Sequence, residues 1–314
     1  MNPAIASCLQ APTVVPECPS VHDWWRQWRS ALATAPVEQA IRGGFAADRV
    51  GWAFASGYQA ALRALLPGLP ADAVAAFCVT EDGGNRPRDI RTRFTPLPDG
   101  SVSIDGAKRW TTLGPESSWL LIVGAMSDVA QAADDARPQL KVARVSATAP
   151  GLQLQAMPET AFVPEVPHAR VQLQGVRVDT AALLPGDGYA RYVKPFRTVE
   201  DIHVTLAVLA YLLREARHRG WPQDFSERTT ALLVAFAELA TASADAATTH
   251  VALAGASSWA QRLYADASAL WARTPDDAAS LRWARDAALF KVAGTARELR
   301  SARAWQRLGE ATTA

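Results

Sequence analysis

The chain has 314 residues, of which 49% are apolar and 20% are charged, and its net charge is +1. This composition predicts a folded protein with two or three compact parts and excludes a disordered chain. The near-neutral charge gives no electrostatic reason to expect nucleic acid as a partner, and no apolar run is long enough for membrane insertion. The three cysteines form no Cys-x-x-Cys pair, so no metal site is predicted, and we expect a cytoplasmic protein.

The N-terminal part, residues 1–75, is predicted to be a short helical segment. Residues 1–20 contain several prolines and are expected to be irregular. Tryptophans at positions 24, 25 and 28 then recur at helical spacing, and a second helical pattern spans residues 46–66. The sequence PGLP at 67–70 ends that pattern.

Residues 76–185 are predicted to form a β-domain. Residues 90–95 are extended, PDG at 98–100 indicates a hairpin turn, and residues 101–105 alternate polar and apolar side chains. Further strands are expected at 119–124, 140–145 and 169–178. Because no long helical pattern interrupts these strands, the sheet should be mostly antiparallel.

Residues 186–314 are predicted to form a C-terminal bundle of four helices. The first three span about 200–217, 226–247 and 251–271. The sequence TPDD at 274–277 is a helix start, and the helix that it opens should run almost to the end of the chain. The fold class is therefore α+β, with domains at 1–75, 76–185 and 186–314.

Two segments of the β-domain carry the most specific pattern. Residues 77–84 read FCVTEDGG, an apolar strand followed by Thr-Glu and a Gly-Gly turn. Residues 106–112 read GAKRWTT, a strand that ends in a tryptophan next to two hydroxyl side chains.

These segments resemble the acyl-CoA dehydrogenase family of flavoproteins. Members carry motifs like CVTEPGAGSD, IKT and GxKxWIT, which correspond here to CVTEDGGNRP at 78–87, IRT at 90–92 and GAKRWTT at 106–112. The likeness covers most of residues 45–310, and the chain is expected to be shortened at both ends relative to the family. The predicted order of helices, β-domain and helical bundle is also that of the family.

The resemblance implies FAD as cofactor and assigns residues to it. Val79 and Thr80 would offer backbone and hydroxyl groups to the pyrimidine edge of the flavin, Trp110 would lie against the ring system, and Thr112 would hydrogen-bond near its N5 atom. The alternative is that Trp110 is a core tryptophan and Thr80 a turn residue. Two strands at matched spacing favour the flavin site.

Glu200 is the candidate catalytic base that the resemblance offers. Most members place the base in a Glu-Gly-Thr loop near the C-terminus, which this sequence lacks, whereas a minority place it at the start of the helix after the β-domain. The alternative is a solvated glutamate favoured by the helix dipole. Arg197, three residues earlier, is expected to lower the pKa of Glu200 and so weaken it as a base.

The family's other cofactor contacts are matched only in part by this sequence. Arg217 matches the family's contact to the adenine half of FAD across a subunit interface, and Gln306 matches a contact from the partner subunit. Arg86 and Arg88 replace part of the family's turn, and either a phosphate contact or an exposed loop fits them equally well.

The function implied by the resemblance is that of an FAD-dependent oxidoreductase which introduces an α,β double bond into an acyl thioester such as an acyl-CoA. A homo-oligomer and an electron-transfer partner are expected with it. The alternative is a degenerate homologue that keeps the scaffold without redox chemistry and acts as a structural or binding partner. The sequence does not decide between them.

Overall fold

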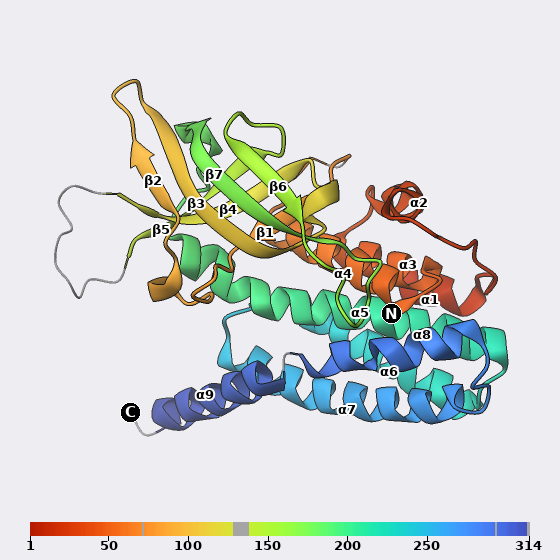
Figure 1. Cartoon of the computed structure of the whole chain (residues 1–314). Helices are drawn as coiled ribbons and strands as arrows, with labels where there is room; N and C mark the ends of the chain where they lie inside the picture. The colour runs from red at the N-terminus through yellow and green to blue at the C-terminus, as the bar shows by residue number, and fades with distance from the viewer. Residues whose placement is uncertain (71, 128–137, 293, 313–314) are drawn as a thin grey trace. The chain divides into compact units, whose positions relative to one another are not determined.

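The computed structural model describes residues 1–70, 72–127, 138–292 and 294–312, and Figure 1 shows their helices and strands in chain order. The chain divides into two compact units. The helical unit comprises Met1–Ala71, Thr160–Glu165 and Phe196–Ala314, and the β-unit comprises Asp72–Glu159 and Val166–Pro195. Among the described residues, no helix combines the length and apolar character needed to cross a bilayer.

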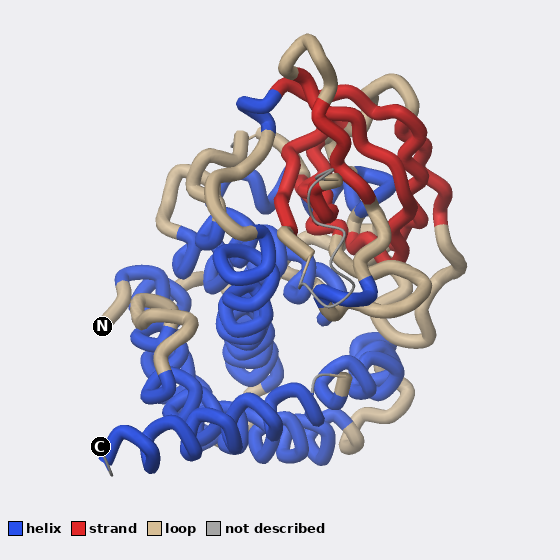
Figure 2. The backbone as a smooth tube through the Cα atoms, turned by 90° about the vertical axis from the view of Figure 1, so that its left-hand side faces the viewer, coloured by secondary structure: helices blue, strands red, loops and turns tan. Residues whose placement is uncertain are grey.

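The β-unit holds a curled sheet of seven strands, drawn in red in Figure 2. The strands are β1 (Ala75–Cys78), β2 (Arg93–Pro96), β3 (Ser101–Thr112), β4 (Trp119–Met126), β5 (Leu140–Ser146), β6 (Leu152–Ala156) and β7 (His168–Asp179). Their order is β1-β4-β2-β3-β7-β6, and β5 also pairs with β4. The strands β1 and β2 pair with β4 in parallel, whereas the other pairs are antiparallel, as predicted for most of the sheet.

Alternation along the long strand β3 builds the core of this sheet. Val102 and Ile104 are fully buried, whereas Ser101, Ser103 and Asp105, which alternate with them, are not. The predicted hairpin leads into β3, with the Gly100 N–H donating to the Leu97 carbonyl at 3.0 Å. Gly100 has φ +83°, which glycine adopts without a steric penalty. Strand β6 has no predicted counterpart, because its five residues are too few to show a clear period.

Four helices open the chain: α1 (Pro3–Gln10), α2 (Val21–Trp28), α3 (Pro36–Ala46) and α4 (Val50–Leu65). The expectation of an irregular segment at 1–20 is therefore wrong for α1. The Asn2 side chain caps this helix by accepting a hydrogen bond from Ala4 N at 2.9 Å. Pro3 occupies the first helical position, where its missing N–H is not needed.

Stacked indole rings connect α2 to α4. The Trp24 ring lies 5.8 Å from that of Trp28 and 5.9 Å from that of Trp52, with interplanar angles of 20° and 13°. All three side chains are buried. The tryptophan spacing that predicts a helix therefore also marks the face that packs into the helical unit.

The C-terminal helices are α5 (Lys194–Arg219), α6 (Gln223–Leu239), α7 (Ala247–Trp271), α8 (Ala278–Asp286) and α9 (Gly294–Thr312). The single last helix predicted from position 274 is wrong, because a short 3-10 helix, η6 (Ala287–Lys291), follows α8. Asp286 at the end of α8 is fully buried and accepts a hydrogen bond from Val163 N at 2.7 Å. That tertiary contact fixes the end of α8 at a point which helical periodicity alone does not mark.

The N-terminal and C-terminal helices belong to one compact unit. The division into three domains at 1–75, 76–185 and 186–314 separates these helices, and it stays a prediction.

Two glycines let α5 approach α3 and α4 at backbone distance. A Cβ on Gly44 would overlap the carbonyl of Ala207, and a Cβ on Gly57 would lie 2.5 Å from the Cα of Val204. Because backbone atoms cannot rotate away as a side chain can, these contacts set the spacing of the helices.

We expect Gly44→Ala to lower the free energy of unfolding by about 1–3 kcal/mol, because the added methyl group overpacks a backbone contact. Gly255→Ala is the matched control, since a Cβ at that position of α7 meets nothing within 4 Å. The control should gain about 0.5–1 kcal/mol from helix propensity. Chemical denaturation of both variants measures the difference, and an unchanged Gly44→Ala variant would show that the helices are free to separate there.

Candidate functional site

The two segments with the specific motif lie side by side in the β-unit. The Arg109 N–H at the end of β3 donates to the Thr80 carbonyl at 2.9 Å, and Lys108 Nζ donates to the Val79 carbonyl at 3.4 Å. Val79 and Thr80 are half-buried. We call the set Val79, Thr80, Trp110 and Thr112 the wall.

Trp110 is held in an unusual backbone conformation. Lys108 pairs with Val171 and Thr111 pairs with Ala169, so β3 advances by three residues where β7 advances by two. The extra residue makes a β-bulge in β3. Trp110 lies in this bulge with φ +57°, a region that bulky residues rarely occupy. Its N–H donates to the Met157 sulfur at 3.4 Å, and its side chain is 46% exposed. The ring is therefore displayed at the surface of the β-unit and is not a core tryptophan.

The exposed indole has two charged or titratable neighbours. The Arg109 guanidinium lies 5.1 Å from the centre of the Trp110 ring, and His168 meets that ring edge-on at 6.1 Å. His168 Nε2 also lies 3.4 Å from Thr112 Oγ1. Sequence reasoning missed His168. Its position at the start of β7, directly opposite Thr112, follows from strand pairing and leaves no signal in the sequence.

A buried ion pair fixes the segment that carries Val79 and Thr80. Glu81 Oε1 accepts hydrogen bonds from Lys108 Nζ at 2.6 Å and from Thr92 N and Oγ1 at 3.1 and 2.8 Å, and Oε2 accepts one from Arg91 N at 2.7 Å. Burial alone would raise the pKa of Glu81, but Lys108 and these hydrogen bonds outweigh burial and lower it. The glutamate of the Thr-Glu motif therefore has a structural role, which is to hold these segments together.

The turn after Glu81 is exposed and rich in charge. Asp82 pairs with Arg109 at 2.8 Å and with Arg170 at 3.1 Å. The turn closes through hydrogen bonds of 2.9 and 3.0 Å between the backbones of Glu81 and Gly84. Arg86 and Arg88 are exposed, which is compatible both with a phosphate contact and with an exposed loop that binds nothing.

Glu200 lies in α5 of the helical unit and is half-buried. Burial raises its pKa to about 8, and the neighbouring Asp201 carboxylate adds to this, while Arg197 and Arg297 oppose it. Arg197 therefore lowers the pKa as expected, but desolvation is the larger effect and the net shift is upward. No residue in the described part of the chain donates a hydrogen bond to the Glu200 carboxylate.

The groups near Glu200 in sequence have clear structural roles. Asp201 pairs with Arg297 at 2.8 Å and with Arg300 at 2.6 Å, which connects α5 to α9. His203 is buried, and its Nδ1 lies 2.8 Å from the Val199 carbonyl. Burial lowers the pKa of His203 to about 4, so the ring is neutral. Glu200 differs from these neighbours because its carboxyl has no hydrogen-bond partner among the described residues.

Arg217 and Gln306 lie on different helices and have local partners. Arg217 Nη1 donates to the Cys8 and Ala11 carbonyls at 2.6 and 2.9 Å, and so caps the end of α1. Gln306 is exposed on α9 and donates to Glu310 at 3.0 Å. Their roles at the adenine half of a cofactor stay predictions.

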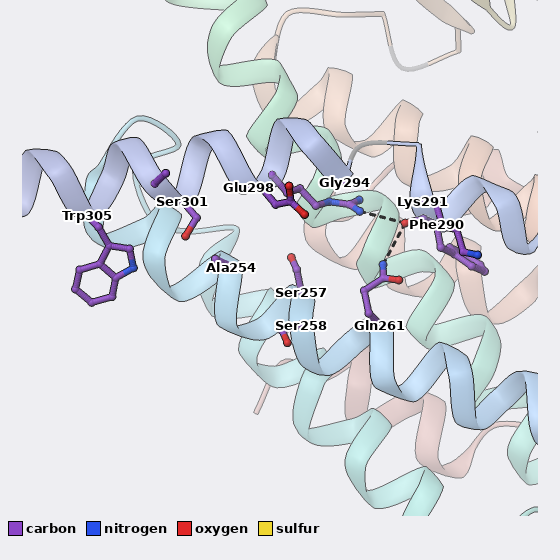
Figure 3. Close-up of a pocket in the computed structure, with 12 residues that line it drawn as sticks. Ala254, Ser257, Ser258, Gln261, Phe290, Lys291, Gly294, Glu298, Ser301 and Trp305 are labelled. Carbon is purple, nitrogen blue, oxygen red and sulfur yellow. Dashed lines mark hydrogen bonds between the residues drawn. The ribbon is translucent and has the colours of Figure 1, made fainter.

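A groove of about 710 Å³ between α7 and α9 contains none of the predicted site residues. Figure 3 shows small side chains such as Ser257 and Ser301 along it, with the Trp305 ring at one end. Gln261 and Arg297 both donate to the Phe290 carbonyl, at 3.2 and 3.3 Å. The groove lining pairs no nucleophile with a base, so we do not place the catalytic site there.

We expect Lys108→Met to lower the free energy of unfolding by about 3–5 kcal/mol, because Glu81 is then a buried charge without its counterion. The control is Arg26→Met, which breaks an ion pair whose arginine is 60% exposed and should cost below about 1 kcal/mol. Equal losses in the two variants would contradict a structural role for the buried pair. Denaturant titration at pH 7 measures both.

Glu200→Gln should stabilise the protein in a pH-dependent way. Because the folded-state pKa of Glu200 is raised to about 8, the wild type loses stability as the pH rises from the ordinary glutamate value of 4.5 toward 8. The variant escapes this loss, so its melting temperature should exceed that of the wild type at pH 8 and match it near pH 4. Glu116→Gln, at an exposed position, is the control that should show no such divergence.

No protein-family model and no curated protein matches the chain in sequence, whereas solved structures match it over nearly its whole length. Butyryl-CoA dehydrogenase from Megasphaera elsdenii superposes with a TM-score of 0.72 at 13% identity, covering 98% of this chain and 99% of the other. PigA with FAD and proline gives 0.68 at 12% identity over 98% and 92%. TdsC from Paenibacillus sp. A11-2, with FMN and indole, gives 0.62 at 17% identity over 83% and 78%. The chain therefore has the fold of the acyl-CoA dehydrogenases.

Proposed function

We propose that this protein is a flavin-dependent dehydrogenase that acts on an acyl thioester, with FAD as its cofactor. The observation that carries the proposal is the wall. It presents an exposed indole, held in a strained bulge, next to two hydroxyl side chains, within a fold shared with flavin-containing structures. Strained backbone concentrates at ligand-binding positions, where the surrounding structure maintains it.

The residues of the wall fit a flat aromatic cofactor. Trp110 offers an apolar face, and Thr80 and Thr112 offer hydroxyl groups at fixed positions on adjacent segments. Val79 and Thr80 would hold the pyrimidine edge, and Thr112 would lie near N5. A bound flavin supplies the acceptor for a hydride, and the protein supplies position and hydrogen bonds.

Glu200 is the proposed base that removes the α-proton of the acyl thioester. A pKa of about 8 makes its ionised form a stronger base than an ordinary carboxylate, although a smaller fraction is ionised at neutral pH. The absence of hydrogen-bond donors to it from the described residues supports this role, because such donors would stabilise the carboxylate and weaken the base.

The choice of FAD over FMN depends on the adenine half of the cofactor, for which Arg217 and Gln306 are the proposed contacts. The comparison structures include one with FAD and one with FMN. An acyl-CoA is the proposed substrate, an electron-transfer protein the proposed acceptor, and a homo-oligomer the proposed assembly, located in the cytoplasm.

The purified protein is expected to carry a flavin with visible absorbance, identified as FAD by chromatography after heat release. Anaerobic butyryl-CoA or octanoyl-CoA should bleach it, with a rate that rises as the pH approaches 8 and levels off above it. Glu200→Gln should keep the flavin and lose about 10²–10⁴-fold in this rate. Glu116→Gln is the control that should bleach normally.

Two results would contradict the proposal at different points. A colourless protein that neither FAD nor FMN stabilises to heating would contradict flavin binding and favour the non-catalytic homologue. Undiminished bleaching by Glu200→Gln would remove this residue from the mechanism while leaving the flavin site intact.

A further inference from the structure

His168 is a part of the wall region that no motif points to. It starts β7, opposite the end of β3, and contacts two wall residues at once. Its Nε2 lies 3.4 Å from the Thr112 hydroxyl, and its ring meets the Trp110 indole edge-on at 6.1 Å. All of these contacts lie within the β-unit.

The contacts of His168 define which of its nitrogens carries the proton. The backbone of Val166 raises the pKa of the ring, as an accepting carbonyl does, against the larger effect of burial. A backbone carbonyl only accepts hydrogen bonds, and Nε2 faces Thr112, so we assign the N–H to Nδ1. Burial lowers the pKa of His168, which keeps the ring neutral at neutral pH. Nε2 is then an acceptor without a proton of its own.

An acceptor at Nε2 determines how the Thr112 hydroxyl is oriented. A hydroxyl has one hydrogen and two lone pairs. If the Thr112 hydrogen is donated to His168, only the lone pairs of Oγ1 face the other side. Thr112 then acts as an acceptor toward anything bound at the wall. At 3.4 Å this is a long hydrogen bond, so it favours one orientation of the Thr112 hydroxyl without fixing it.

We propose that His168 is a positioning residue which holds the Thr112 hydroxyl as a hydrogen-bond acceptor toward N5 of the bound flavin. This inference rests on the proposed function, because it requires a flavin at the wall with N5 near Thr112. It adds a residue and a role that the motif resemblance does not supply.

The orientation of this hydroxyl matters because N5 changes its hydrogen-bonding character during the reaction. In an oxidised flavin N5 carries a lone pair and needs a donor, whereas after hydride transfer it carries a hydrogen and needs an acceptor. A Thr112 hydroxyl that donates its hydrogen to His168 can only accept from N5, which suits the reduced flavin. The His168–Thr112 pair therefore favours the reduced cofactor and makes its reduction potential less negative.

The test compares reduction potentials of the flavin-loaded variants by anaerobic titration against reference dyes. His168→Phe keeps a ring edge beside Trp110 and removes the acceptor, so Thr112 is free to donate to the oxidised flavin, and the potential should become more negative. His168→Gln retains an acceptor and should stay closer to the wild type. In a Thr112→Val background, His168→Phe should cause no further shift, because the hydroxyl through which it acts is absent.

A second readout needs no flavin. In the wild-type protein without cofactor, ¹⁵N NMR should show His168 as the neutral tautomer with its proton on Nδ1, and Thr112→Val should shift the Nε2 resonance. The opposite tautomer, or an Nε2 resonance unaffected by Thr112→Val, overturns the inference.

The remaining outcomes distinguish the positioning role of His168 from flavin binding itself. A flavin that binds, with a potential unchanged in His168→Phe or shifted equally in the Thr112→Val background, overturns the positioning role and leaves the proposed function standing. A protein that binds no flavin overturns both, and circular dichroism of each variant shows whether the β-unit is folded.

Discussion

The buried ion pair between Glu81 and Lys108 is the interaction on which the wall depends. A carboxylate and an ammonium group lose most of their hydration there, and only close contact and additional hydrogen bonds make this tolerable. Glu81 meets Lys108 at 2.6 Å and also accepts hydrogen bonds from the backbones of Arg91 and Thr92. Three stretches of chain are thereby held together, and the Thr80 carbonyl is placed where Arg109 N meets it.

The bulge at Trp110 and the buried carboxyl of Glu200 are both locally unfavourable, and each persists because of its surroundings. Trp110 occupies a left-handed conformation that the flanking pairs of β3 and β7 impose. Glu200 has its pKa raised to about 8 because burial and the neighbouring Asp201 carboxylate outweigh the charges of Arg197 and Arg297. Strained backbone and strongly shifted pKa values are typical of residues that bind a ligand or transfer a proton.

The motif spacing predicted which residues of the wall would lie together, and the structure brings Val79, Thr80 and the end of β3 into contact. It did not indicate His168, because a single histidine at the start of a strand has no distinctive pattern. The sequence also indicated the pKa-lowering effect of Arg197 on Glu200, but not the larger effect of desolvation, which raises the pKa. The spacing to Arg197 is visible in sequence, whereas desolvation depends on every segment that packs around the carboxyl.

The sequence by itself determined the kinds of elements and their order, since helical and alternating periods are local properties of the chain. It located the hairpin at 98–100, the long strand β3 and most of the C-terminal helices. Only the tertiary structure decided where α8 ends, which charges are buried and how Trp110 is displayed. These outcomes depend on contacts such as that between Asp286 and Val163, which join residues far apart in the chain and leave no periodic trace in it.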